Sequence, residues 1–160
     1  MIVVIDKNEL IEFINKKIKD QDSKIVVIGK DELKESKRKI VVKDKSELKR
    51  LIAQRIKEQG PNCDLNDIDV SHITDMSYMF ADSTFNGDIS QWDVSNVTNM
   101  DSMFWSSVFD GDISRWDVSN VENMRSMFWG SQFNSDISKW DVSNVKIMDC
   151  MFRRSKFNGD

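Results

Sequence analysis

A phrase of ten residues, nine of them fixed, recurs at intervals of 24 and constrains the fold of this chain more than any other feature. DISQWDVSNV begins at Asp88 and returns as DISRWDVSNV at Asp112 and as DISKWDVSNV at Asp136. A single active site needs its residues once, whereas a surface built by stacking needs them in every layer. The repetition therefore predicts a fold of stacked coils.

The period of 24 extends beyond this phrase and defines four units: 64–87, 88–111, 112–135 and 136–159. Large apolar residues keep the same register from unit to unit: Trp92, Trp116 and Trp140; Phe85, Phe109, Phe133 and Phe157; Met76, Met100, Met124 and Met148. One coil cannot bury its apolar face alone, and four are enough for a solenoid. We predict that the Met and Phe residues are core rather than a metal or cofactor site.

The apolar spacing within a unit predicts how one coil is built. Apolar residues stand at positions 1, 4, 6 and 9 of the second unit: Ile89, Trp92, Val94 and Val97. This spacing is similar to the L-x-x-L-x-L-x-x-N line of leucine-rich repeats, which contains a short strand. In the following segment Met100, Met103 and Phe104 fall on one side of a helix. Each coil is therefore expected to consist of a short strand, a turn and a short helix.

Residues 1–60 contain a different duplication, because 2–21 matches 40–59 at 11 of 20 positions. Each copy is a β-branched run followed by the capping-box spacing of a helix start, Asp6 with Glu9 and Asp44 with Glu47. In the second copy the residues on one helical face are Leu48, Leu51, Ile52 and Ile56, and Gly60 with Pro61 predicts the helix end. Residues 24–29 are expected to form another strand and 31–36 a short helix. We expect this α/β segment to cap the open first coil.

Charge separates the same two regions. Residues 1–60 carry 16 Lys+Arg and 11 Asp+Glu, whereas residues 61–160 carry 7 and 16, together with all five Trp. The acidic region has the apolar mass to pack, so it is neither a disordered tail nor a surface for polyanions. We predict two domains, 1–60 and 61–160, and no direct binding of nucleic acid.

The amino terminus and the two cysteines bear on location. MIVVIDKNELIEF lacks a basic start followed by a long apolar stretch, so neither a secretory signal nor membrane insertion is expected. Cys63 and Cys150 lie far apart in sequence, and two isolated thiols favour a reducing compartment over a disulfide. For the chain as given we expect a cytoplasmic location, and the cell surface if it is a processed fragment.

The phrases FNGDISQWDVSNV and NMDSMF resemble the BspA-like, lipoprotein-type leucine-rich repeats of many bacterial surface proteins. The resemblance covers residues 64–160, and GPNCDLNDIDVSHITDMSYMF resembles the usual start of such arrays. It implies an α/β solenoid of leucine-rich-repeat type with roles in adhesion and protein binding. The expected fold is thus a short right-handed solenoid with an N-terminal α/β capping segment.

The aspartate that follows the Trp of the repeated phrase raises the question of a metal site. One Asp column runs through all four units: Asp69, Asp93, Asp117 and Asp141. Stacking would place these carboxylates about 5 Å apart, where like charges repel. Calcium would offset the repulsion, but the Gly-rich and EF-hand patterns of calcium sites are absent from the sequence. We favour carboxylates that accept hydrogen bonds from Ser or backbone N–H groups, and expect neither a metal nor a cofactor.

No catalytic constellation is recognisable in the sequence. A P-loop, a nucleophile elbow, zinc-ligand spacing and a dinucleotide-binding motif are all absent. The lone His72 replaces Asn in the first unit and is interpreted as a turn variant, because no nucleophile or carboxylate is identified for it. We therefore expect that the protein is not an enzyme.

Positions that vary between fixed neighbours are the candidates for partner binding. One column lies beside the Asp column, on the expected concave face: Gln91, Arg115 and Lys139. A second follows the helix motif and consists of Trp105, Trp129 and Arg153, extended by Tyr78 and Arg154. Two indoles at successive levels are either an exposed anchor for a partner or a filler between adjacent helices, and both alternatives stay open.

These features predict a non-catalytic protein-binding module of the adhesion or surface-protein type. One alternative is a small intracellular inhibitor that docks on a larger complex, for instance on a nucleic-acid-binding defence complex whose site the acidic region would occupy. The other is a structural protein that assembles through its uncapped C-terminal coil.

Overall fold

The computed structural model describes residues 39–159. The chain divides into two compact units, 1–38 and 39–160. The first copy of the duplication, 2–21, and the elements expected at 24–29 and 31–36 lie outside the described residues. The described part contains the strand β1 (Ile40–Val41), the helix α2 (Lys45–Gln59) and the strand β2 (Ile68–Asp69).

Helix α2 begins and ends where its sequence predicts. Asp44 is the N-cap, and its carboxylate accepts a hydrogen bond from the N–H of Glu47 at 2.9 Å. The Glu47 carboxylate reaches back to the N–H of Lys43 at 2.6 Å. At the other end Gly60 has a φ of 88°, and its N–H donates to the carbonyl of Ile56 at 2.9 Å. The predicted cap and stop are confirmed, and together they satisfy backbone groups that a helix end leaves without partners.

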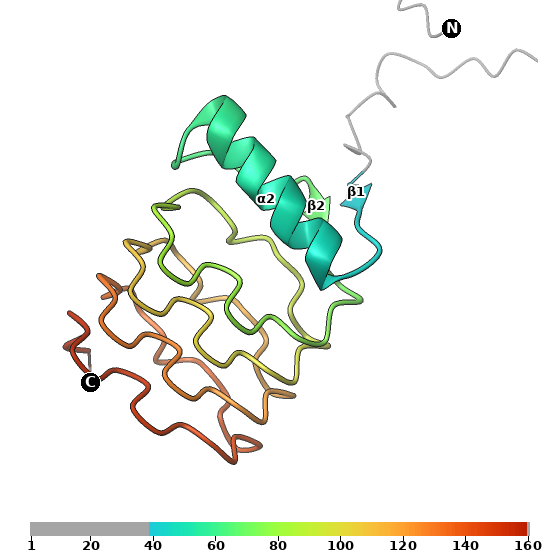
Figure 1. The fold of residues 1–160 in the computed structure, drawn as a ribbon. Helices are drawn as coiled ribbons and strands as arrows, with labels where there is room; N and C mark the ends of the chain where they lie inside the picture. Colours follow the sequence, from blue (N-terminus) through green and yellow to red (C-terminus); the bar gives the residue numbers. More distant parts are fainter. Residues whose placement is uncertain (1–38, 160) are drawn as a thin grey trace, which may run out of the picture. The chain divides into compact units, whose positions relative to one another are not determined.

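Residues 39–60 share a compact unit with the repeats and cover the first of them (Figure 1). Leu48 and Ile52 are buried in the common core, and Leu51 and Ile56 pack against it. Strand β1 adds a parallel pair to β2, with Ile40 opposite Ile68. The apolar face that was expected for this helix is confirmed, and it lies on the first repeat.

Two ion pairs join α2 to the first repeat at the edge of this apolar contact. The Lys45 ammonium lies 2.9 Å from the Asp75 carboxylate and also donates to the Ser77 hydroxyl at 2.6 Å. The Arg55 guanidinium lies 2.6 Å from the carboxylate of Asp67. Both contacts are charge-assisted hydrogen bonds between specific pairs, so they favour one register of the helix on the repeat.

Successive units lie in parallel at an offset of 24 residues. Bridges between neighbouring units join Asp64 to Asp88, Asp75 to Asn99, Asn99 to Asn123 and Asn123 to Ile147. In Figure 1 the chain after α2 winds through one layer after another, and the C-terminus lies at the end of these layers opposite α2.

Aromatic ladders fill the space inside these layers. Phe80, Phe104, Phe128 and Phe152 stack with ring centroids 5.4, 5.5 and 5.6 Å apart. A second ladder of Phe85, Phe109, Phe133 and Phe157 has separations of 6.0, 6.4 and 6.2 Å. Met100, Met103, Met124 and Met127 are fully buried beside them. The prediction that the Met and Phe columns form the core is confirmed for the first three units. In the fourth unit it is wrong for Met148, which is 47% exposed, while Phe152 and Phe157 are half-buried against the core.

Tight turns occupy the segment where each unit was expected to form a short helix. In the second unit the N–H groups of Met100, Ser102, Phe104 and Ser106 donate to carbonyls of the third unit at 2.8, 2.8, 2.9 and 2.7 Å. Ser102 and Ser106 adopt left-handed φ values of 54°, which interrupts any helical run. The inward faces of Met103 and Phe104 are as predicted, but the backbone bonds across layers instead of along a helix.

Each tryptophan of the repeated phrase forms a hydrogen bond with the preceding unit. The indole N–H groups of Trp92, Trp116 and Trp140 donate to the carbonyls of Leu65, Ile89 and Ile113 at 2.9, 3.1 and 3.1 Å. Each indole is therefore buried with its polar atom satisfied. The side-chain amides of Asn96, Asn120 and Asn144 make a second series, donating to the carbonyls of Ser71, Ser95 and Ser119.

Removing one ring from the ladder tests how much the stack depends on it. Phe104 is fully buried between Phe80 and Phe128, so Phe104→Ala should lower the free energy of unfolding by about 3–5 kcal/mol. Urea unfolding followed by circular dichroism measures the change. The exposed Val108→Ala is the control and should cost less than about 0.5 kcal/mol. Equal losses in the two variants would contradict the ladder as a main source of stability.

Candidate protein-binding surfaces

The two outward tryptophans stack on each other at the surface. The rings of Trp105 and Trp129 are 5.1 Å apart at an angle of 7°, and both side chains are half-buried. The guanidinium carbon of Arg154 lies 5.6 Å from the centroid of the Trp129 ring, within the range of a cation–π contact. The sequence left open whether these indoles are exposed or packed. In the structure they pack on each other and still present part of their surface to solvent.

Local backbone geometry positions this tryptophan strip, which we define as Tyr78, Trp105, Trp129, Arg153 and Arg154. The residues that follow Trp105, Trp129 and Arg153 are left-handed, with φ values of 54° at Ser106, 65° at Gly130 and 61° at Arg154, and Tyr78 is itself left-handed at 55°. Glycine adopts this conformation without penalty, and small or polar residues adopt it at a modest cost. The repeated turn directs the side chains just before it to the same face in every unit.

The ends of the strip are more exposed than its centre. Tyr78 is 50% exposed, and its carbonyl accepts a hydrogen bond from the Lys49 ammonium of α2 at 3.4 Å. Arg153 and Arg154 are both exposed in the fourth unit. The strip therefore combines two stacked indoles with a phenol toward α2 and two cations away from it.

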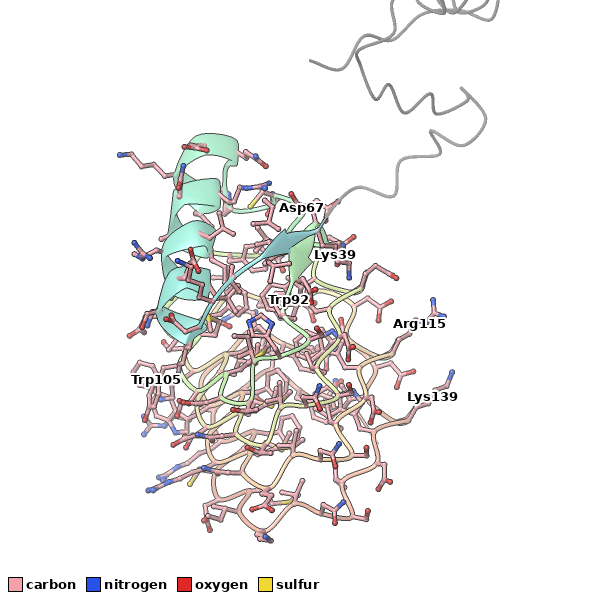
Figure 2. The ribbon with its side chains drawn as sticks, turned by 90° about the vertical axis from the view of Figure 1, so that its right-hand side faces the viewer. Lys39, Asp67, Trp92, Trp105, Arg115 and Lys139 are labelled. Carbon is pink, nitrogen blue, oxygen red and sulfur yellow. The ribbon has the colours of Figure 1, made fainter. Side chains whose placement is uncertain are left out.

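The variable column forms a separate surface. Gln91, Arg115 and Lys139 are exposed, and the first member of the same register, Asp67, is paired with Arg55. Figure 2 shows Arg115 and Lys139 projecting on the side of the molecule opposite Trp105. Neither cation forms an ion pair within residues 39–159. The structure brings together the members of each candidate column but does not bring the two columns together.

Serine residues satisfy the Asp column. Asp69, Asp93, Asp117 and Asp141 each accept the N–H of the serine two residues later, at 3.0, 3.1, 3.1 and 3.0 Å. The serine hydroxyl adds a bond of 2.6–2.7 Å in the first three units. Hydrogen bonds from the serine side chain and N–H lower the pKa of Asp69, Asp117 and Asp141. This is the geometry that a structural role for the column predicts.

The aspartates that open each unit behave in the same way. Asp88, Asp112 and Asp136 accept the N–H groups of Ser90, Ser114 and Ser138 at 2.9, 2.9 and 2.8 Å. These backbone hydrogen bonds are the main cause of the lowered pKa of all three carboxyls. No cluster of three or more His, Cys, Asp or Glu with metal-binding geometry occurs in residues 39–159.

The sequence did not predict some of the contacts between the described residues. The pairing of Lys45 with Asp75 and of Arg55 with Asp67 joins α2 to the repeat, and neither pair has a recognisable spacing. The asparagine amides that join neighbouring units could have been predicted from the repeats. Asn96, Asn120 and Asn144 are invariant within the repeated phrase although their neighbours already account for the turn.

The lowered carboxyl pKa values make stability depend on pH. Because the folded state holds these carboxyls below their ordinary pKa of 3.8, the unfolded chain binds protons more readily in acid. Stability should therefore be constant from pH 7 to about 5 and fall between about pH 5 and pH 3. Urea unfolding at each pH measures this, and the double variant Asp112→Asn/Asp117→Asn should show a flatter profile. A wild-type profile that stays level down to pH 3 would contradict the assignment.

Comparison with known proteins places the chain in a family without naming its activity. The model of the family described as "Mycoplasma protein of unknown function, DUF285" matches residues 47–160, which include most of α2 and all four repeats. Neither a curated protein nor a solved structure matches the chain. Within the described residues, no helix has both the length and the apolar composition to cross a membrane. Since the match spans well over half of its length, the chain belongs to the DUF285 family.

Proposed function

We propose that this protein is a non-catalytic protein-binding module, in which four coils of leucine-rich-repeat type form a short solenoid capped by residues 39–60. The parallel bridges at an offset of 24 residues and the continuous phenylalanine ladders support the solenoid. Membership of the DUF285 family is compatible with the BspA-like resemblance of the repeats, on which an adhesion-type role rests.

The tryptophan strip is the observation that carries the proposal. Trp, Tyr and Arg are the residues that contribute most often to binding energy in protein interfaces. In the strip Trp105 and Trp129 hold each other in place at 5.1 Å, and Arg154 lies over the second ring. Binding of a partner there costs little side-chain entropy, because the two indoles already hold each other in place before the partner binds.

The composition of the strip indicates what kind of partner surface fits it. An apolar or aromatic group would cover the exposed part of the two indoles. A carboxylate would suit Arg153, which is exposed and forms no ion pair within residues 39–159. The proposed partner is therefore a protein that presents an apolar side chain next to an acidic one.

Paired substitutions separate the two candidate surfaces. Trp105→Ala/Trp129→Ala should weaken the partner complex at least tenfold, because removal of one central interface tryptophan commonly costs about 2 kcal/mol or more. Arg115→Ala/Lys139→Ala is the matched control on the opposite side and should leave binding unchanged. The partner is first identified by affinity purification from the native cell, and its dissociation constant is then measured for each variant.

The folded state of each variant is checked by its thermal unfolding. Full binding by the tryptophan variant together with loss of binding in the arginine–lysine variant would move the site to the variable column. Loss of binding in neither variant would refute both surfaces. The identity of the captured protein decides between an adhesion target and a larger intracellular complex.

A further inference from the structure

Two segments of this chain share one sequence pattern, and the described residues show what one of them contacts. Residues 40–59 cover the first repeat through β1 and α2. Residues 2–21, outside the described part, match them at 11 of 20 positions with an offset of 38. The structure of the second copy shows which of these positions matter for packing.

The apolar residues that contact the repeat are identical in the two copies except at Leu51, whose counterpart is Phe13. In residues 40–59 the side chains of Val42, Leu48 and Ile52 are buried, and Ile56 packs against the core. At the offset of 38 their counterparts are Val4, Leu10, Ile14 and Ile18. Residues 2–21 therefore keep four of the five apolar residues with which the second copy packs on the repeat, and the fifth position stays apolar.

The residues that make the polar contacts have charged counterparts as well. Lys45, which pairs with Asp75, corresponds to Lys7. Arg55, which pairs with Asp67, corresponds to Lys17, so the charge is retained. The capping pair of Asp44 and Glu47 has its counterpart in Asp6 and Glu9.

The differences between the copies lie mainly on the solvent side. Among the 12 positions of 40–59 that are exposed, 7 differ: Lys43, Ser46, Lys49, Arg50, Ala53, Gln54 and Glu58. Among the 8 buried or half-buried positions, only Leu51 and Arg55 differ, and they become Phe13 and Lys17. A helix that only had to be amphipathic would not need to keep both the apolar residues and the two cations.

The two cations identify the face that such a segment fits. Asp67 and Asp75 are the carboxylates that pair with α2. In the other three units the same registers hold Gln91, Arg115 and Lys139, and Asn99, Asn123 and Ile147. Of the four units, only the first combines the two carboxylates that Lys7 and Lys17 would need.

We propose that residues 2–21 are a second cap, which docks on the first-repeat face of a second copy of this chain when that face has lost its own cap. Within one molecule, residues 40–59 lead directly into the repeats through Gly60, and this short connection gives them the advantage on their own face. Residues 2–21 are then available to bind the first-repeat face of another molecule. This interaction uses neither the tryptophan strip nor the proposed partner.

A mixture of two full-length forms tests the proposal. The acceptor carries Leu10→Asp/Ile14→Asp and Leu48→Asp/Ile52→Asp, so it lacks both caps, and the donor is the wild-type chain. Size-exclusion chromatography with light scattering should show a 1:1 complex. A donor with Leu10→Asp/Ile14→Asp should bind at least about tenfold more weakly, because each buried apolar side chain contributes more than 1 kcal/mol.

The matched control donor carries Ile11→Asp/Asn15→Asp, at positions that correspond to the exposed Lys49 and Ala53, and should bind like wild type. Equal binding by all three donors, or no complex with a folded acceptor, would overturn the proposal. If the acceptor does not fold alone, the same four residues are changed to Ala, and the donor must then either bind it or restore its near-UV circular dichroism. The variant Leu48→Asp/Ile52→Asp lacks only its own cap. If it stays monomeric and loses stability when Leu10 and Ile14 are also changed to Asp, residues 2–21 dock within the same molecule, and the intermolecular interaction is overturned.

Discussion

Backbone hydrogen bonds between residues 24 positions apart are the constraint on which the rest of this structure depends. In the second unit four N–H groups between Met100 and Ser106 donate to the third unit at 2.7–2.9 Å. Backbone groups in the interior must find partners, and here the partners belong to the neighbouring layer. A layer therefore cannot be completed by itself, and the phenylalanine ladders, the Trp indoles and the Asn amides all strengthen the same junction.

The sequence predicted those features whose cause is local or periodic. The start of α2 at Asp44 and its stop at Gly60 follow from capping chemistry within a few residues, and the core role of Met100 and Phe104 follows from their period. The residues after Val97 form tight turns and not the expected helix. The prediction was wrong because a spacing of three and four residues points side chains inward in tight turns as well as in helices. The choice between them depends on carbonyls one layer away, which local spacing does not reveal.

The residues of the candidate surfaces could be selected from the sequence, but the packing and pairing of their side chains could not be predicted from it. The column of Trp105 and Trp129 was evident from the repeats, whereas their stacking at 5.1 Å and the position of Arg154 depend on the left-handed turns that follow each position. Similarly, Asp67 belongs to the variable column by register, yet Arg55 of α2 removes it from that surface. Contacts between segments with no common period are decided by the packing of the cap, which only the structure supplies.

The N–H groups of the turn segment that donate to another unit all donate to the unit that follows, from Met76 to Asn99 and again from Met124 to Ile147. Every junction is thus chemically equivalent to the next, with the same donors above and the same acceptors below. Gain or loss of 24 residues at a junction would leave this hydrogen-bond pattern intact, whereas an insertion of any other length would leave buried groups without partners. Lineages of such proteins can therefore change in length by whole units while their individual coils stay under strict constraint.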